Sequence, residues 1–301
     1  MSLLTIFLEN LLPVMMLAGV GLLLQRLLRI DPRPLSQVVF YAFSPALVFS
    51  LLIKIPFEVG EMFRMAAFVA LLLLVLALIS WGLARALGLS RTMTSAFVLC
   101  VTFMNAGNLG LPITQLAFGE VTLAWATVFF STTSLTANSA GAWIAGVGRT
   151  NAREALAGLA KVPAVYAIPL ALYLRSQHLS LPPVLAAPVG LLAAATIPSM
   201  LLLLGMQLGR NGRPTRPGLL GLTAVLRLVV SPALAWGFAQ WFRLPPAAAQ
   251  AGILEAAMPS AVLTSILAAQ YDVEPEFVSG AILLTTVLSP LTLVPILSLL
   301  R

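Results

Sequence analysis

The 301-residue sequence is poor in the residues that build disulfide bonds, metal clusters and water-soluble surfaces. It has one cysteine, Cys100, and one histidine, His178, which excludes a disulfide within the chain and a His/Cys metal cluster. Only 9% of the residues are charged, whereas 60% are hydrophobic and the mean hydropathy is +1.01. Too few polar side chains remain to cover a soluble protein, so the composition indicates an integral membrane protein.

The charged residues that are present are mostly basic, with 17 Lys and Arg against 10 Asp and Glu. A net charge of +7 can indicate nucleic-acid binding in a soluble protein. Here the basic residues lie mainly in short connections between apolar runs, where they are signals of membrane topology. We therefore expect no nucleic-acid partner.

Ten apolar stretches are separated by charged residues, proline or glycine. A spanning helix needs roughly 20 apolar residues, so the chain has room for about ten spans. The first stretch lacks the basic beginning of a cleavable signal peptide, and we expect it to be retained. The predicted spans are 5–28, 35–53, 63–87, 94–118, 121–146, 155–175, 184–208, 218–242, 249–270 and 277–300.

The basic residues are distributed unevenly between the two sides of the membrane. Eleven lie in the odd-numbered connections, from Arg26 to Arg216, and five lie in the even-numbered connections and at the C-terminus. Because basic loops stay in the cytoplasm, we expect cytoplasmic odd-numbered connections and extracytoplasmic termini. The prediction is a multi-pass protein of the cell membrane with no soluble domain.

Ten spans divide into two sets of five, and an odd number per half gives the halves opposite orientations. Pro112 and Pro259 lie in similar surroundings 147 residues apart, and a second pair of prolines is 153 residues apart. This spacing predicts two inverted five-helix repeats, residues 1–148 and 149–301. In secondary transporters, the substrate site lies where such halves meet.

The fourth predicted span contains residues that disfavour an unbroken helix. Asn105, Asn108 and Gly110 tolerate other backbone angles, and Pro112 lacks an amide donor and clashes with the preceding turn. An interruption exposes backbone polar groups, which is tolerable in a membrane only around a cavity. We expect a half-helix starting near Pro112 to point its positive end at this cavity, with both asparagine amides beside it. Such a site favours an anion.

The ninth predicted span repeats the pattern at Pro259. Ser260 is expected to cap or line the following half-helix, and Glu255 lies one turn before the proline. A carboxylate at that depth is costly unless it is protonated, paired or bound to a cation. Two interpretations stay open: Glu255 takes part in binding substrate or a coupling ion, or it forms a salt bridge with Arg227 of the eighth span.

Other polar residues support weaker hypotheses. The run from Ser131 to Ser139 in the fifth span either lines the cavity or forms hydrogen bonds between helices. His178 is predicted to lie in an external loop. No nucleotide-binding loop or nucleophile motif is present, so we expect neither an enzyme nor a bound cofactor.

These residues resemble the auxin efflux carrier family, whose plant members are the PIN-type auxin carriers. The resemblance rests on Asn105, Gly110 and Pro112, on the run 256–259 and on the stretch 271–276, and it extends over nearly the whole chain. It implies an all-α fold of ten transmembrane helices in two inverted repeats, with broken, crossing helices four and nine, as in sodium/proton antiporters and bile-acid transporters. It also implies that the residue matching Asn105 lies near a bound carboxylate.

Two features depart from the plant carriers. About eight residues, 147–154, link the fifth and sixth spans, where the plant carriers have a long cytoplasmic loop. Glu255 stands where the plant carriers have a neutral residue, and it resembles the sodium-coordinating glutamate of the bile-acid transporters. The resemblance therefore suggests coupling to a cation, and it extends the expected substrates from auxin to small carboxylates such as malate and malonate.

The sequence thus predicts a secondary transporter of small organic carboxylates that works by alternating access. A cation/proton antiporter on the same fold is the nearest alternative, and an intramembrane enzyme or receptor is a more distant one. Expected partners are the lipid bilayer, the carboxylate and H⁺ or Na⁺ as coupling ion, with a homodimer left open. The predicted substrate-binding residues are Asn105, Asn108, Gly110, Pro112, Pro259 and Ser260, with Glu255 as the ion-coupling residue.

Overall fold

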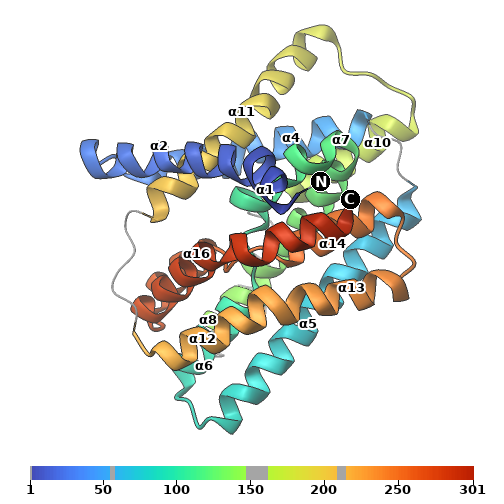
Figure 1. Cartoon of the computed structure of the whole chain (residues 1–301). Helices are drawn as coiled ribbons and strands as arrows, with labels where there is room; N and C mark the ends of the chain where they lie inside the picture. Colours follow the sequence, from blue (N-terminus) through green and yellow to red (C-terminus); the bar gives the residue numbers. More distant parts are fainter. Residues whose placement is uncertain (1, 55–57, 147–161, 209–214) are drawn as a thin grey trace.

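The computed structural model describes residues 2–54, 58–146, 162–208 and 215–301, and these residues are almost entirely helical (Figure 1). Their β-type pairing is one isolated antiparallel bridge. Seven helical segments are long and apolar enough to cross a membrane, which supports a multi-pass membrane protein. They are Leu3–Leu28, Pro32–Lys54, Val59–Ala86, Ala106–Ala145, Pro183–Leu208, Pro217–Trp241 and Pro275–Leu300.

Short π-helical turns, labelled η, continue several α-helices without a break. The first part of the chain forms α1 (Leu3–Ile6), η1 (Phe7–Leu11), α2 (Leu12–Leu28), α3 (Pro32–Val38), η2 (Val39–Phe43), α4 (Ser44–Lys54), α5 (Val59–Ala86), α6 (Arg91–Thr102), η3 (Ala106–Gly110), α7 (Leu111–Thr136), η4 (Ala137–Gly141) and α8 (Ala142–Ala145). The second part forms α10 (Ala164–Ser176), α11 (Pro183–Leu208), α12 (Pro217–Val225), η5 (Leu226–Val230), α13 (Ser231–Trp241), α14 (Pro246–Ala256), α15 (Leu263–Tyr271) and α16 (Pro275–Leu300).

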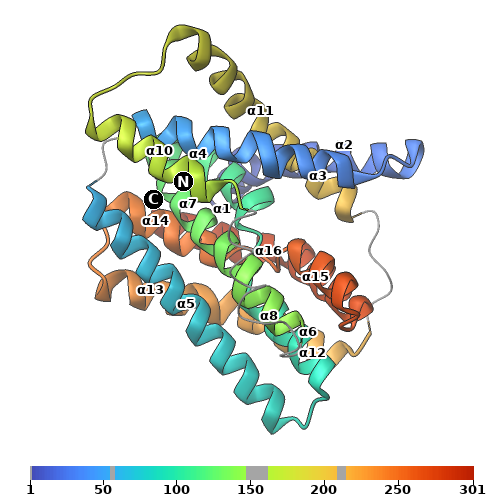
Figure 2. The same ribbon diagram turned by 180° about the vertical axis from the view of Figure 1, so that it is seen from behind.

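The helices form two groups that lie side by side (Figures 1 and 2). One group contains α2, α3, α4, α10 and α11, and the other contains α5, α6, α8 and α12 to α16. The segment formed by η3 and α7 contacts both groups, because it packs against α11 as well as α14. The residues of η3 and α7 therefore lie where the two groups meet.

Within the first group, α2 and α11 approach each other closely. A Cβ atom on Gly21 would overlap the backbone of Leu202, and a Cβ atom on Gly205 would overlap the backbone of Ala18. Small residues that let helix backbones touch are typical of helix pairs in membranes. The two glycines are thus required by the contact itself.

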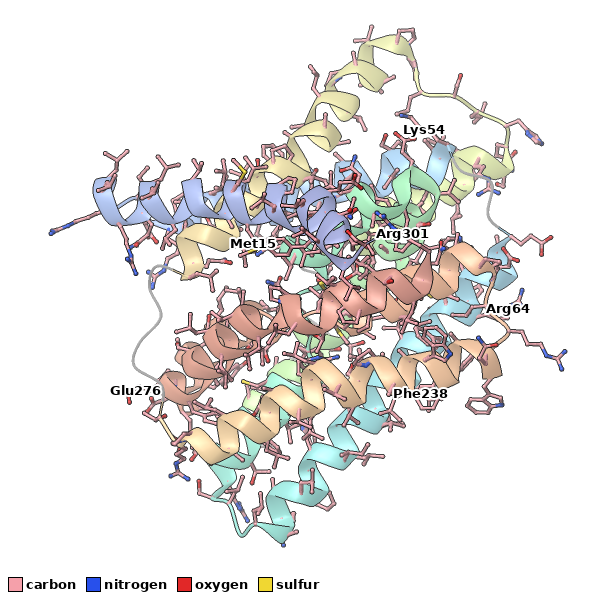
Figure 3. All side chains as sticks on the ribbon, viewed as in Figure 1. Met15, Lys54, Arg64, Phe238, Glu276 and Arg301 are labelled. Carbon is pink, nitrogen blue, oxygen red and sulfur yellow. The ribbon has the colours of Figure 1, made fainter. Side chains whose placement is uncertain are left out.

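Several charged side chains lie near the outer ends of the helices. Arg64 and Glu276 lie at opposite ends of the molecule in Figure 3. The two chain ends lie close together (Figures 1 and 2), where Arg301 Nη2 donates a hydrogen bond of 3.0 Å to Asn10 Oδ1. This bond connects the end of α16 to η1.

Length and hydropathy distinguish seven crossing segments and not the ten spans predicted from sequence. Ala106–Ala145 is one segment by length and hydropathy, but it covers parts of two predicted spans. The chain bends between these two parts at Gly119 (φ 78°, ψ −167°). Predicted spans 94–118 and 249–270 are interrupted, so neither contains a continuous helix of sufficient length. Outside the described residues lie the start of predicted span 155–175, the predicted repeat boundary at 148–149, and Arg149, Arg153, Lys161, Arg210 and Arg213.

Candidate functional site

Two helices are interrupted, and their interruptions lie against each other. α6 ends at Thr102 and the helix resumes with η3 at Ala106; α14 ends at Ala256 and α15 begins at Leu263. Asn105 has φ −77° and ψ 56°, outside the helical region, as its neighbouring glycines led us to expect for this segment. The backbone groups exposed in each interruption need partners from elsewhere in the chain.

The two interruptions provide these partners for each other. The amide of Asn105 donates a hydrogen bond to the carbonyl of Pro259 (2.8 Å), and the amide of Ala261 donates to the carbonyl of Phe103 (2.9 Å). Between these bonds lies the isolated antiparallel bridge formed by Met104 and Ser260. Segments more than 150 residues apart in sequence are thereby joined inside the protein.

The second half of the first interrupted helix begins at Ala106 and not near Pro112, as predicted. Pro112 is buried in the first turn of α7, which continues η3 directly. Because the helix already runs from Ala106, Pro112 lies inside it, where a proline removes one amide donor and clashes with the preceding turn; the π-helical turn η3 lies directly before it. Pro259, in contrast, lies within the second interruption.

Ser260 neither caps α15 nor lines the cavity described below, which corrects the prediction. Its Oγ donates a hydrogen bond to the carbonyl of Cys100 (2.8 Å), and its amide donates to Thr285 Oγ1 (3.1 Å). The residue before α15, Val262, provides no side-chain cap. Ser260 therefore fixes the second interruption to α6 and α16.

A cavity with a volume of about 120 Å³ opens beside the interruptions. Its wall comes from both interruptions and from α3, η2, α4, η3, α7, η4, α11 and α15, so both helix groups contribute. Aromatic rings and methionines make up much of its apolar surface. Of the predicted site residues, the wall contains Asn105 and Asn108 but not Gly110, Pro112, Pro259, Ser260 or Glu255.

Several hydrogen-bond donors at the cavity have no acceptor within the described residues. One is Asn105 Nδ2, whose side chain is 5% exposed. The others are backbone amides in the first turns of two helices: Gly107 and Asn108 in η3, and Val262 and Leu263 at the start of α15. Uncapped helix starts carry partial positive charge. None of the residues that the structure places in the cavity wall is charged, so these donors dominate its electrostatics.

Asn108 also connects η3 to the group of helices that contains α11. Its Nδ2 donates a hydrogen bond of 3.2 Å to Oε1 of Gln207 in α11, and both residues line the cavity. Sequence reasoning missed Gln207, because a single glutamine near a helix end, 99 residues from its partner, has no distinguishing pattern. The hydrogen bond must break if η3 and α11 separate.

The polar run in α7 and η4 divides into two kinds of residue. Thr133 and Ser134 line the cavity. Four other side chains donate hydrogen bonds to carbonyls of the preceding turn of their own helix: Thr132, Thr136, Asn138 and Ser139. For these four residues, the predicted alternative of hydrogen bonds between helices is wrong.

Glu255 is fully buried in the last turn of α14. Its Oε1 accepts a hydrogen bond from Thr114 Oγ1 (3.3 Å), and its Oε2 has no partner within the described residues. Gly110 lies so close that a Cβ atom there would be 2.5 Å from Glu255 Cδ. The salt bridge with Arg227 considered from sequence is not found among these residues.

Arg227, fully buried in η5, binds backbone carbonyls instead. Its Nη1 donates to the carbonyls of Val101 (2.5 Å) and Thr102 (3.3 Å), at the end of α6. Its Nη2 donates to the carbonyl of Ala256 (2.7 Å), at the end of α14, and to Ser231 Oγ. One guanidinium group thus contacts the C-terminal ends of both interrupted helices.

The profile of the membrane transport protein family matches residues 6–150 and again residues 148–297. The chain belongs to this family. The resemblance to auxin efflux carriers inferred from the sequence is thereby confirmed.

Two similar proteins are also described as transporters. An uncharacterized transporter of Methanothermobacter thermautotrophicus is 27% identical over 292 residues, which cover 95% of each chain. An uncharacterized transporter of Methanocaldococcus jannaschii is 23% identical over 269 residues, or 86% of each chain. The family and both relatives indicate membrane transport and favour it over catalysis.

Proposed function

We propose that this membrane transport protein carries small organic carboxylates across the cell membrane by alternating access, and that the cavity at the two interruptions binds the substrate. The observation that carries the proposal is the set of unpartnered donors: the side-chain amide of Asn105 and the first backbone amides of η3 and α15. A carboxylate accepts several hydrogen bonds at once and is attracted to helix starts. A hydrogen bond to a charged group contributes about 1.5–3 kcal/mol, so two or three of them offset much of the carboxylate's desolvation.

The same donors disfavour a cation in this cavity. Glu255 lies outside the described cavity wall, so no carboxylate in that wall offsets the positive helix starts. The apolar part of the wall, which includes Phe40, Phe103 and Phe130, suits the hydrocarbon part of an organic anion.

Ligand-dependent unfolding of the purified protein tests this site. Ligands that bind the folded state raise its unfolding midpoint, and at 100 times Kd they stabilise it by about 2.7 kcal/mol. We expect carboxylates, but not the corresponding neutral amides, to raise the midpoint of the wild type. Asn105→Ala should weaken this response. Asn138→Ala should not, because the Asn138 side chain donates to the carbonyl of Ser134 in the preceding turn and lies outside the cavity wall.

A series of mono- and dicarboxylates that leaves the wild-type midpoint unchanged would contradict the proposal. An unchanged response in Asn105→Ala would remove that residue from the site. Uptake and release by proteoliposomes then separate transport from binding alone.

We further propose ten transmembrane helices in two inverted repeats, 1–148 and 149–301, with the interrupted helices crossing between them. Two observations support this architecture: the same family profile matches each half of the chain, and the interruptions pair in antiparallel fashion. In this arrangement the group with α2 and α11 serves as the scaffold, and the group with α5 and α14 moves against it. Measuring distances between spin labels on the two groups, with and without carboxylate, tests the movement.

Orientation is part of the same proposal: both termini outside, and the cavity open to the cytoplasm. Ser36 and Gln207, in the cavity wall, lie three residues from Arg33 and Arg210 of connections predicted to be cytoplasmic. Ile266, also in the wall, is 49% exposed. A cysteine at Ile266, with Cys100 replaced by alanine, should react with an impermeant maleimide in inside-out vesicles but not in intact cells; the reverse result contradicts this orientation.

Glu255 is proposed to bind the coupling ion, H⁺ or Na⁺. The support is a fully buried carboxyl group with Thr114 as its assigned partner and no basic partner among the described residues. Glu255→Gln should abolish the dependence of carboxylate transport on Na⁺ and pH, whereas Glu276→Gln, at an exposed position, should preserve it. Unaltered Na⁺ and pH dependence in Glu255→Gln would exclude this role.

The buried carboxyl group also favours one alternative function, a cation/proton antiporter on the same fold. A pH gradient imposed on proteoliposomes without any organic anion distinguishes the two. Cation exchange under that condition supports the antiporter, and its absence together with carboxylate transport supports the function proposed first.

A further inference from the structure

Arg227 lies where two interrupted helices leave carbonyl groups exposed inside the protein. The last carbonyls of a helix have no intrahelical donor, and together they carry about half a negative charge. α6 and α14 both end at this point, so two such negative ends come together. Water would cap them at a surface, but within a membrane the protein must supply the donors.

The guanidinium group fits this task in its shape as well as its charge. It presents donors in a planar fork, and its two terminal nitrogens divide between the two helices: Nη1 to α6 and Nη2 to α14. Ser231 completes the arrangement, because its Oγ accepts from Nη2 and donates to the carbonyl of Ala256 (2.8 Å). Within the described residues, Arg227 has no carboxylate partner.

We propose that Arg227 is a built-in counter-cation for the two helix ends, holding the position that a free cation would otherwise occupy. It joins α6 to α14 directly before the interruptions and thereby positions the donors of η3 and α15. The second statement rests on the proposed function, because it concerns substrate binding. The first concerns only the charge and the hydrogen bonds at the helix ends.

The proposal predicts that removing the side chain creates a cation site. Arg227→Ala removes the guanidinium donor from the carbonyls of Val101 and Thr102, leaves Ser231 Oγ as the side-chain donor to the Ala256 carbonyl, and opens the space that the guanidinium group had filled. Free guanidinium ion has the same charge and the same planar donors, so it should bind in that space. Urea has nearly the same shape and donors but no charge, which makes it the matched control.

Thermal unfolding of the purified full-length protein measures the effect. We expect Arg227→Ala to lower the unfolding midpoint by roughly 10 °C. Millimolar guanidinium should restore at least half of this loss, whereas urea and choline chloride should not. Restoration by sodium as well would also support a counter-cation, because carbonyl oxygens bind sodium too. The wild type and Arg216→Ala, which alters an exposed arginine, should show no rise with guanidinium.

Failure of guanidinium to restore stability, or equal restoration by urea, would overturn the proposal. Two further variants keep it testable if Arg227→Ala does not fold. Stability should decrease from wild type to Arg227→Lys to Arg227→Met, because lysine keeps the charge but loses the fork. Equal stability of the lysine and methionine variants would show that the charge is irrelevant and would also overturn it.

The positioning role has a separate readout. In Arg227→Ala, guanidinium should restore the carboxylate-dependent rise in midpoint together with the stability. Stability restored without this response would refute the positioning role alone. Because the stability measurements contain no carboxylate, a failure of the proposed transport function leaves their result unaffected.

Discussion

Gly110→Ala places a methyl group where the Glu255 carboxyl group lies, and it tests how firmly that group is held. Gly110 has φ −65° and ψ −54°, which alanine adopts readily, so backbone strain does not contribute. The new Cβ atom would overlap Glu255 Oε2 and would lie 2.5 Å from Cδ and 2.7 Å from Oε1. Nonbonded atoms prefer about 3.5 Å, so the carboxyl group must move by more than about 1 Å.

The cost of this movement can be worked out from the contacts. Inserting a methyl group into a packed interior costs about 1–3 kcal/mol, and losing the hydrogen bond from Thr114 costs about 1 kcal/mol more. Alanine returns up to about 1 kcal/mol as the better helix former. The net loss of roughly 1–3 kcal/mol corresponds to a midpoint lower by about 2–10 °C for a chain of this size.

A double-mutant cycle isolates the contact from other effects. In the Glu255→Ala background the clash is absent, so Gly110→Ala should cost little, and the coupling free energy should be about 1–3 kcal/mol. Gly82→Ala is the matched control, because nothing lies within 4 Å of its Cβ position. The reasoning is refuted if Gly110→Ala is as stable as the wild type, or if it costs the same with and without the Glu255 side chain.

Gly205→Ala should destabilise the protein more than Gly110→Ala, because its Cβ atom would meet the backbone of Ala18, which cannot rotate away as a side chain can. The unfolding midpoint in detergent measures this, and a smaller loss than for Gly110→Ala contradicts it. A short, reducible crosslink between cysteines at Asn108 and Gln207 should stop transport by holding η3 against α11, and reduction should restore it. Full transport with the crosslink intact would show that η3 and α11 do not separate there.

The sequence identified the segments that are interrupted but not the residues where the helices stop. Proline, glycine and asparagine mark such segments because they weaken or lack helical hydrogen bonds. The end point depends on which backbone groups find partners elsewhere. Asn105 leaves the helix where its amide reaches the carbonyl of Pro259, and that contact is invisible before the chain is folded.

The partner of Arg227 could not be predicted for a similar reason. A pattern of residue types shows charged side chains but not the carbonyl groups that helix ends expose. In the sequence, Glu255 is the acidic residue predicted to lie deep in the membrane near Arg227, so a salt bridge between them was one of the two interpretations. In the structure the uncovered ends of α6 and α14 provide the acceptors for the guanidinium group, and Glu255 lies against Gly110.

The close approach of α2 and α11 limits how this protein can change shape. Sliding either helix by one residue, about 1.5 Å, would bring a side chain to a place where only a hydrogen atom fits, at both Gly21 and Gly205. The two helices must therefore move together as one rigid body or not move at all. Any rocking motion has to be taken up at surfaces with side chains that can repack, and the faces of η3 and α7 toward α11 are such surfaces.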